Sequence, residues 1–464
     1  MQRLSVVFTF AAAIFVAFLI VQGQSKFVVA AVAAALLLAM VLRRIPMMIA
    51  AVVCLQTIHS PVISNDYYIT PFKVFFVALV VAGALAILRR GRLYFGARAF
   101  FYAMLAMLFI RTISEIVASA GHVGDMPQML ASGFMVFICV QFVGTIEDHR
   151  DLLRVYVVGL LISGLWVLVE VPPRLLMIGV NVRALGPGNQ PNTTGSVCAT
   201  LFLLTVPMIL DKRLDKGWRI AAGMGILANA YVQFATASRG VLLATVAALM
   251  VLAWFLQRDA NRRVAAIAAV VLSVAVFMAV APAAFMYRVE RTVQVADVGG
   301  GYEINDSARL VLATLAVEMI KESPLIGHGG RGFQQRAAMY FGGPSGAMAV
   351  HTAYLGVAVG HGLVCALIWT LVLFGAFFAS AWLCMQSTGP PRLYYAGLTS
   401  MLGFKVVFAL ASVEGFDQLS WLHIGLAYHY LQQHLETPKN PVEQVPATQL
   451  LQPKSPARVL PLVR

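Results

Sequence analysis

An arginine interrupts one of the long apolar stretches of this sequence. Ser238-Arg239-Gly240 lies within the stretch from Ile220 to Gln257. The ordinary interpretation is an arginine that extends from a membrane boundary toward lipid headgroups. An arginine that faces inward from the end of a helix is instead suited to bind phosphate, because its planar guanidinium group donates two parallel hydrogen bonds. Arg239 is therefore our first candidate phosphate ligand.

Further basic residues lie in the long polar segment 286–350, which contains Arg288, Arg309 and Arg331. Within it, the residues from Ser307 to Glu322 predict a helix, because apolar side chains recur there at helical spacing and a proline follows the end. Arg309 falls in the first turn of this helix. We regard all three arginines as candidates for binding an anion.

A glycine-rich stretch follows the predicted helix. It reads Pro324-Leu325-Ile326-Gly327-His328-Gly329-Gly330-Arg331-Gly332-Phe333. Glycines permit tight turns, and successive backbone N–H groups in such turns can surround an anion. An isolated stretch of this kind is ordinarily a solvated loop, but its position between Arg309 and a histidine favours a functional interpretation.

That histidine is His351, which ends the polar segment. It directly precedes the apolar run that begins Thr352-Ala353-Tyr354-Leu355. An imidazole has an unperturbed pKa of about 6.5, so it can accept a proton at neutral pH. A lone histidine at a membrane surface is usually a satisfied interfacial residue, whereas one beside several arginines is a candidate general base. Tyr354 is placed either to orient His351 or to pack against lipid.

A second polar segment, 171–195, carries Arg183. Turn-forming residues follow it, in the order Gly186-Pro187-Gly188-Asn189-Gln190-Pro191-Asn192, and the chain then enters an apolar run at about Ser196. Arg183 is a further candidate for binding an anion.

Three ionisable residues lie inside apolar runs. Arg111 and Glu115 are four residues apart, so they share one helix face and can neutralise each other, which is a structural role. Lys405 has no obvious local partner, although Glu414 or Glu170 could reach it in the folded chain. We treat Lys405 as a weaker functional candidate.

The composition excludes a water-soluble globule. Of 464 residues, 60% are hydrophobic and only 12% are charged, against about 25% charged in soluble domains. The net charge of +14 comes mainly from short Lys and Arg clusters between apolar runs, so lipid headgroups and membrane topology explain it and a nucleic-acid partner is not expected. The five cysteines lie in apolar runs without metal-like spacing, and no bound metal or cofactor is expected.

Apolar runs of about 20 residues predict about twelve to fourteen membrane-spanning helices. The run 352–386 is too long for one straight helix, and its glycines from Gly356 to Gly362 predict a broken or partly re-entrant first part. We interpret the first apolar run as a retained span. The predicted spans lie near 4–22, 27–42, 45–60, 70–88, 99–118, 130–146, 152–170, 196–210, 220–237, 240–257, 264–284, 352–386, 395–412 and 418–434.

The basic clusters fall on every second loop, which predicts that those loops are cytoplasmic. The intervening loops 59–68, 118–128 and 412–420 contain no Lys or Arg. The segments 171–195 and 286–350 then lie on the opposite side of the membrane, since long loops translocate whatever their charge. We expect one membrane domain over 1–436, both termini in the cytoplasm, and a disordered tail over 437–464.

These features together resemble the O-antigen ligase and polymerase superfamily, whose members are glycosyltransferases of the bacterial inner membrane. The resemblance rests on the 186–192 turn, Ser238-Arg239-Gly240, Arg309 ahead of Pro324-Leu325-Ile326-Gly327-His328-Gly329, and His351-Thr352-Ala353-Tyr354-Leu355 followed by Gly362. It covers roughly residues 180 to 430. Thr352 departs from the family pattern, which usually has Asn beside the histidine.

The resemblance implies an all-α, C-type glycosyltransferase-like membrane fold and metal-independent, inverting transfer of a glycan from an undecaprenyl-diphosphate donor at the periplasmic face. Arg239 and Arg309 would contact the diphosphate, with Arg183, Arg331 and Arg288 as further ligands. His351 would be the base and Tyr354 its support. Preorganised arginines can stabilise the departing diphosphate without a metal ion.

Three alternatives remain open. Within the family, the acceptor is either another lipid-linked glycan, as in O-antigen or exopolysaccharide polymerisation, or a lipid A-core sugar or a protein, as in ligation. The predicted tail and span number favour a polymerase by analogy. From other classes, the chain could be a transporter or flippase for lipid-linked sugars, or a non-catalytic subunit that works with flippase and export proteins.

Overall fold

A computed structural model describes residues 45–55, 71–91, 93–118, 126–177, 183–187, 190–282, 285–286, 306–341, 350–412 and 417–436. The regular secondary structure of these residues is entirely helical. The helices are α3 (Ile45–Leu55), α4 (Pro71–Arg90), α5 (Arg98–Val117), α6 (Met126–Phe142), α7 (Ile146–Glu170), α8 (Pro173–Met177), α9 (Pro191–Thr205), α10 (Pro207–Leu210), α11 (Lys216–Thr236), α12 (Arg239–Leu256), α13 (Ala260–Ala279), α15 (Asp306–Glu322), α16 (Gly332–Phe341), α17 (Ala353–Gln386), α18 (Gly389–Phe408) and α19 (Gln418–Glu436).

The predicted spans near 4–22 and 27–42 and the tail 437–464 lie outside the described residues. Each of the other predicted spans coincides with a helix or helix pair, and the helix predicted from Ser307 to Glu322 is α15. Among the described residues, six helical stretches are long and apolar enough to cross a membrane: α5, α7, α9 with α10, α12, α13 and α17. The chain thus has several candidate membrane-spanning helices, as the apolar runs predicted.

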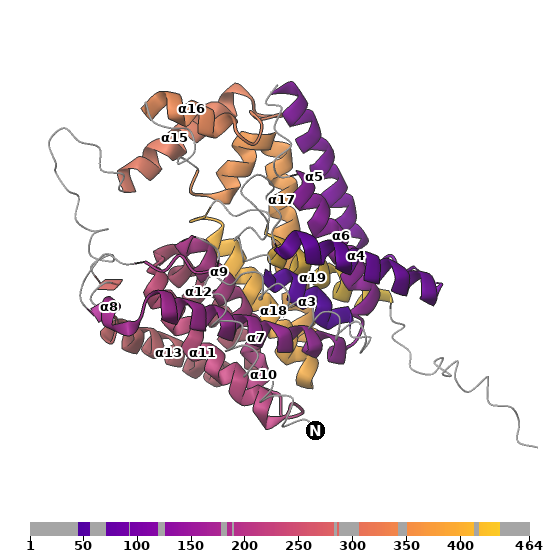
Figure 1. Ribbon diagram of the computed structural model, residues 1–464, viewed down its shortest axis with the longest axis vertical. Helices are drawn as coiled ribbons and strands as arrows, with labels where there is room; N and C mark the ends of the chain where they lie inside the picture. Colours follow the sequence, from indigo (N-terminus) through magenta and orange to yellow (C-terminus); the bar gives the residue numbers. More distant parts are fainter. Residues whose placement is uncertain are drawn as a thin grey trace, which may run out of the picture.

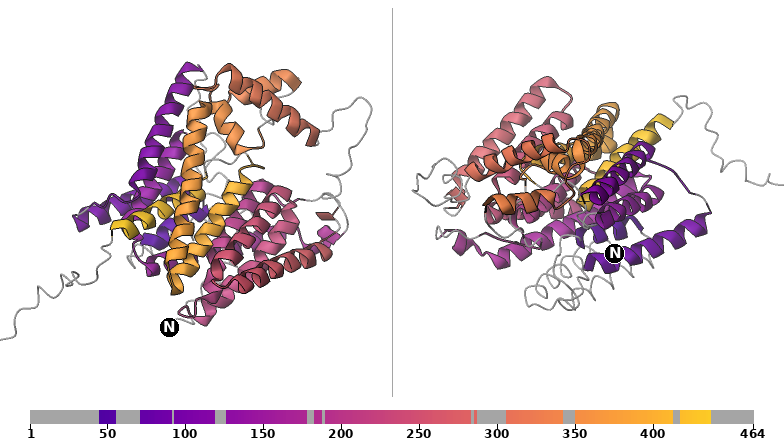
Figure 2. Two further views of the ribbon diagram at one scale, coloured as in Figure 1. Left: turned by 180° about the vertical axis from the view of Figure 1, so that it is seen from behind. Right: turned by 90° about the horizontal axis from the view of Figure 1, so that it is seen from above.

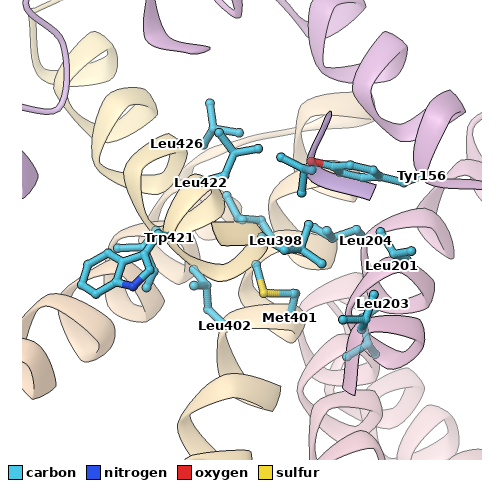
Figure 3. Close-up of a cluster of buried hydrophobic side chains, with 14 of the residues drawn as sticks. Tyr156, Leu201, Leu203, Leu204, Leu398, Met401, Leu402, Trp421, Leu422 and Leu426 are labelled. Atoms are coloured by element: carbon cyan, nitrogen blue, oxygen red, sulfur yellow. The ribbon is translucent and has the colours of Figure 1, made fainter. Parts of the chain in front are cut away.

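Helices α18 and α19 lie in the middle of the bundle (Figure 1). Helix α18 packs against α12 and α17, and α19 packs against α6 and α17. Leucine and methionine side chains fill the space between these central helices and α9 (Figure 3). The labelled members of this core are Tyr156, Leu201, Leu203, Leu204, Leu398, Met401, Leu402, Trp421, Leu422 and Leu426.

Helix α17 is broken at Gly362, as its glycines predicted. Gly362 has φ 83° and ψ 166°, which only glycine adopts readily. The Tyr354 and Trp369 rings, which precede and follow the break, lie with centroids 5.1 Å apart. An unbroken helix would separate these residues by about 22 Å along its axis. The first part of α17 therefore folds back beside the second part.

Helices α15 and α16 form a small lobe on this re-entrant part of α17. Their apolar side chains share a cluster with Val350 and Val359. The lobe lies at the end where α5 and α17 rise above the other helices (Figures 1 and 2). Its position makes the 324–332 loop and the start of α17 neighbours of the rest of the bundle.

The opposite end of the bundle holds a buried ion pair. Arg150, at the start of α7, contacts Asp211 with a shortest N–O distance of 2.6 Å, and Tyr394 donates a hydrogen bond of 2.5 Å to the same carboxylate oxygen. Thr145 and Asp148 form a capping box at the start of α7. The Arg150 side chain is 5% exposed and joins α7 to α18.

Candidate functional site

Three helix N-termini and two helix C-termini meet at one end of the bundle. The start of α9 contacts the turn between α11 and α12, since a Cβ atom on Gly195 would lie 3.2 Å from Thr236 Oγ1 and 3.5 Å from a Val241 methyl group. The end of α18 contacts the start of α12 at Gly240, where a Cβ atom would lie 2.9 Å from the Ala411 side chain. The site is built where these helices meet.

Arg239 is the first residue of α12, directly after a sharp turn. Ala237 ends α11 in the left-handed conformation, with φ 46° and ψ 43°, and Leu242 N–H donates to Ser238 O at 3.0 Å to begin the next helix. The interruption predicted at Ser238-Arg239-Gly240 is therefore a helix-helix turn. Arg239 is partly exposed and lies at the N-terminus of α12, where the helix dipole adds positive potential.

Arg183 reaches the same turn from another segment. Its Nε donates to Thr236 O at 2.8 Å and one terminal nitrogen donates to Asn192 Oδ1 at 3.2 Å. Glu170, at the end of α7, accepts hydrogen bonds of 2.8 Å from the N–H groups of Leu185 and Gly186. Arg183 thus ties the end of α11 to the start of α9, and Glu170 is not the partner of Lys405 that the sequence suggested.

His351 lies two residues before the start of α17, and it is partly exposed. Ala353 N–H donates to Ala409 O at 2.8 Å, and Tyr354 Oη donates to Val406 O at 3.1 Å. Both contacts fix the start of α17 to the end of α18. The Tyr354 hydroxyl group is bonded to the backbone of α18, and its ring packs edge-on against Trp369.

Lys405 lies near the end of α18 and belongs to the same group of helix ends. Its Nζ is 3.3 Å from Asp417 Oδ2 and 3.4 Å from Ser196 Oγ, and its side chain is 6% exposed. Glu414 lies outside the described residues. The partner Asp417 was missed from the sequence, although it directly precedes α19.

The glycine-rich loop does not form the expected anion site. The N–H groups of His328 and Gly329 donate to the carbonyl groups of Val359 and Gly360 at 2.8 and 2.9 Å. The Gly330 N–H group donates to Glu115 Oε1 at 2.8 Å. These donors are engaged within the protein because the loop supplies hydrogen bonds to the broken segment of α17.

The remaining candidate arginines are spread along the lobe. Arg309 is in the first turn of α15, and its side chain lies outside the described part, as does all of Arg288. Arg331 is exposed and directly precedes α16. The adjacent loop bonds to the far end of α15 through His328 Nε2 and Met319 O, 2.8 Å apart. Since Arg309 and Met319 are separated by about 15 Å along a helix, Arg309 and Arg331 do not flank one point of the loop.

Helix ends and side chains give the site a positive potential. The N-termini of α9, α12 and α17 each carry roughly half a positive charge, and Arg183, Arg239 and Lys405 lie among them. Within the described ranges, no group of three or more His, Cys, Asp or Glu side chains is close enough to hold a metal ion. The arrangement is suited to bind an anion beside a histidine.

One known protein family matches part of this chain. Residues 224–370 match the family model described as O-antigen ligase. No curated protein matches the chain significantly. The matched stretch runs from α11 into α17 and includes Arg239, Arg309 and His351, whereas Arg183 and Lys405 lie outside it. The resemblance predicted from the motifs is therefore confirmed over residues 224–370, which form an O-antigen ligase family domain in a chain with several candidate membrane-spanning helices.

Proposed function

We propose that the protein transfers a glycan from an undecaprenyl-diphosphate donor to an acceptor sugar at the periplasmic face of the bacterial inner membrane. The observation that carries this proposal is the meeting of Arg183, Arg239 and the start of α17 beside His351 at one end of the bundle. The O-antigen ligase match implies the class of reaction. The apolar helices would hold the polyprenyl chain while its diphosphate meets this end.

The proposed reaction is a single displacement at the anomeric carbon. His351 takes the proton of the acceptor hydroxyl group as its oxygen forms the new glycosidic bond. The bond from the anomeric carbon to the diphosphate oxygen breaks, and the diphosphate leaves on the lipid with both electrons. One displacement inverts the configuration at that carbon.

Arginine side chains would stabilise the charge that develops on the leaving diphosphate. Arg239 is at a helix N-terminus, where its charge and the helix dipole act on the same anion. We propose Arg239 and Arg309 as the principal diphosphate ligands and Arg183, Arg331 and Arg288 as further ones. In this mechanism cationic side chains take the place that a divalent ion holds in other glycosyltransferases.

The test is a transfer assay with purified protein and a lipid-diphosphate-linked glycan. His351→Ala is expected to lower the rate about 10²- to 10⁴-fold, and Arg239→Ala about 10²- to 10³-fold. The matched controls are His434→Ala and Arg262→Ala, whose side chains lie in the last turn of α19 and the first turn of α13. If folded His351→Ala or Arg239→Ala protein transfers sugar as fast as the wild type, the mechanism is wrong.

The acceptor is tested in the same assay. We propose a second lipid-linked glycan as the acceptor, which makes the protein a polymerase of O-antigen or exopolysaccharide. Offering this glycan and a lipid A-core together distinguishes polymerisation from ligation by the product formed. Labelling of residues 286–350 from the cytoplasmic side only would contradict the periplasmic site.

A transporter or flippase remains the alternative from another class. Such a protein would move the lipid-linked sugar across the membrane and form no new glycosidic bond. Accumulation of the intact donor in the opposite leaflet, with no transfer product, would favour this alternative. A non-catalytic subunit of an export assembly would show neither transport nor transfer.

A further inference from the structure

Helices α12, α13 and α17 have neighbouring ends, at the end of the bundle away from Arg239. Helix α12 ends at Leu256 and α13 begins at Ala260. Between them, Arg258 Nη2 donates to the carbonyl oxygen of Ser387, directly after α17, at 3.0 Å. All three helices are long and apolar enough to cross a membrane. In a bilayer, this place lies at the level of the lipid headgroups.

Two further arginines are held here by backbone carbonyl groups. Arg392, in the first turn of α18, donates from Nε and Nη2 to Phe255 O at 3.1 and 2.8 Å, and from Nη2 to Gln257 O at 3.2 Å. Arg263, on α13, donates from Nε to the same Gln257 oxygen at 3.0 Å. Because Arg263 and Arg392 share one acceptor, their guanidinium groups are neighbours. We call Arg258, Arg263 and Arg392 the arginine cluster.

The positive charge of the arginine cluster is only partly compensated. None of its members forms an ion pair with a carboxylate in the described part of the chain. The adjacent Asp259 carboxyl group accepts a hydrogen bond of 2.8 Å from the Asn261 N–H group and caps α13. The ends of α12 and α17 each supply roughly half a negative charge. A net positive charge therefore remains, and Arg258 and Arg263 are close enough for their charges to act on Arg392.

The arginine cluster keeps N–H groups with which it can bind an anion. Arg258 bonds to the described residues through Nη2 alone, and Arg263 through Nε alone. Their other guanidinium nitrogens can donate to the oxygens of a ligand. A planar guanidinium group matches the geometry of a phosphate group, and the bonds to carbonyl oxygens already orient these side chains. The arginine cluster is therefore suited to bind phosphate.

An apolar surface borders the arginine cluster. The guanidinium carbon of Arg263 lies 4.8 Å from the centre of the Trp254 ring, and the Trp254 side chain is 48% exposed. No residue of α13 is buried, so this helix presents apolar side chains to its surroundings. Tryptophan is enriched at the level of membrane headgroups. A ligand that matches both surfaces has a phosphate group and acyl chains.

We propose that the arginine cluster binds the headgroup of one anionic phospholipid, whose acyl chains lie against Trp254 and α13. The phosphate oxygens accept hydrogen bonds from Arg258 and Arg263. A zwitterionic phospholipid is bound less tightly, because it carries an ammonium group that the arginine cluster repels. The length of α12, about 25 Å, separates this site from Arg239, so lipid binding does not depend on glycan transfer.

The test is lipid binding to the purified full-length protein, measured by native mass spectrometry after its own lipids have been removed in detergent. Phosphatidylglycerol and phosphatidylcholine with identical acyl chains are titrated separately, and inorganic phosphate is added as a competitor. Wild-type protein is expected to bind one phosphatidylglycerol at least about tenfold more tightly than phosphatidylcholine. Arg258→Gln and Arg263→Gln are each expected to lower the affinity for phosphatidylglycerol about tenfold, and that for phosphatidylcholine much less.

Arg219→Gln is the matched control, because Arg219 is half-buried near the start of α11 and donates to a backbone carbonyl group, Ile209 O, at 2.9 Å. It is expected to bind both lipids as the wild type does. Arg258 is exposed, and a glutamine at its position can still donate to Ser387 O. The folding of Arg258→Gln protein is therefore not expected to suffer, which thermal unfolding checks.

Three results would overturn the lipid proposal. The first is equal affinity of the wild type for the two phospholipids, and the second is displacement of phosphatidylglycerol by an equal concentration of inorganic phosphate. The third is a preference for phosphatidylglycerol that folded Arg258→Gln protein retains in full, or loses no more than Arg219→Gln protein does. A role of these arginines as helix caps alone would change the melting temperature but not this preference.

The lipid and glycan proposals fail separately. Arg239→Ala is expected to keep the preference for phosphatidylglycerol while it loses sugar transfer, because Arg239 lies at the other end of α12. Absence of the preference in wild-type protein contradicts only the lipid proposal. Absence of transfer contradicts only the proposed function.

Discussion

Gly362 lies against the backbone of Leu325, so that a Cβ atom added to Gly362 would overlap the Leu325 carbonyl oxygen. Next to this contact, Leu363 N–H donates to Pro324 O at 2.7 Å. The glycine-rich loop and the break in α17 are thus built on each other. The first part of α17, which begins two residues after His351, ends at this contact.

We expect Gly362→Ala to lower both stability and transfer activity. The backbone conformation of Gly362, with φ 83° and ψ 166°, costs a residue other than glycine about 1–3 kcal/mol, and relief of the overlap with Leu325 moves the loop. The melting temperature and the transfer rate of the purified variant measure the two effects. Gly356→Ala is the control in the same part of α17, since nothing lies within 4 Å of its added Cβ atom. Equal stability of the two variants would contradict this explanation of the break.

At the turn before Arg239, a substitution can relieve backbone strain instead of adding it. Ala237 holds a left-handed conformation, so Ala237→Gly removes strain. We expect this variant to be at least as stable as the wild type, with a gain of up to about 1 kcal/mol. Ala222→Gly, within α11, is expected to lose about 1 kcal/mol. Unfolding by heat or denaturant compares them, and a less stable Ala237→Gly protein would show that the turn is not strained.

The ion pair between Lys405 and Asp417 can be examined by a double-mutant cycle. Removing one partner leaves a buried charge, which costs about 3–5 kcal/mol, whereas removing both together costs much less. We therefore expect Lys405→Met and Asp417→Leu each to be less stable than the double variant. Additive losses in unfolding free energy would mean that the pair is not coupled.

Local sequence predicted the elements well. The length of an apolar run indicates whether it can span a bilayer. The polar residues Ser238-Arg239-Gly240 indicate a turn, and Gly362 permits a break in a helix. These features need no knowledge of distant residues. The predictions of a break in α17 and of a turn before α12, made from sequence alone, were therefore correct.

Contacts between distant segments could not be predicted in this way. Arg150 and Asp211 are 61 residues apart in sequence, and nothing local pairs them. From the sequence, the N–H groups of the glycine-rich loop were expected to bind an anion. In the structure they donate to carbonyl groups of α17, which come later in the chain and cannot be identified as acceptors from the loop alone. The seven-residue spacing of His149 with Tyr156 and of His423 with Tyr430 was visible, but only the structure shows that the two rows face each other.

The buried Arg150–Asp211 pair gives stability a dependence on pH. Burial raises the pKa of the Asp211 carboxyl group, but hydrogen bonds from Tyr394, from the Arg213 N–H group and from Arg150, together with the charge of Arg150, outweigh burial and bring this pKa below its ordinary value. A carboxyl group with a lowered folded-state pKa stabilises the fold at pH values above its unfolded pKa of about 3.9. This contribution is lost as the pH falls through the folded-state pKa.

Asp211→Asn is therefore expected to destabilise the protein by about 3 kcal/mol at pH 7, because Arg150 loses its buried partner. The difference from wild type should begin to narrow as the pH falls below about 4, where the Asp211 carboxyl group of the unfolded chain becomes protonated, and should narrow further as the pH falls through the lowered folded-state pKa. Thermal unfolding in detergent across this pH range measures the change. Asp215→Asn, at an exposed position near the start of α11, should differ from wild type by less than about 0.5 kcal/mol. A constant difference between Asp211→Asn and wild type from pH 7 to pH 3 would show that the ionised carboxylate is not what stabilises this end of the bundle.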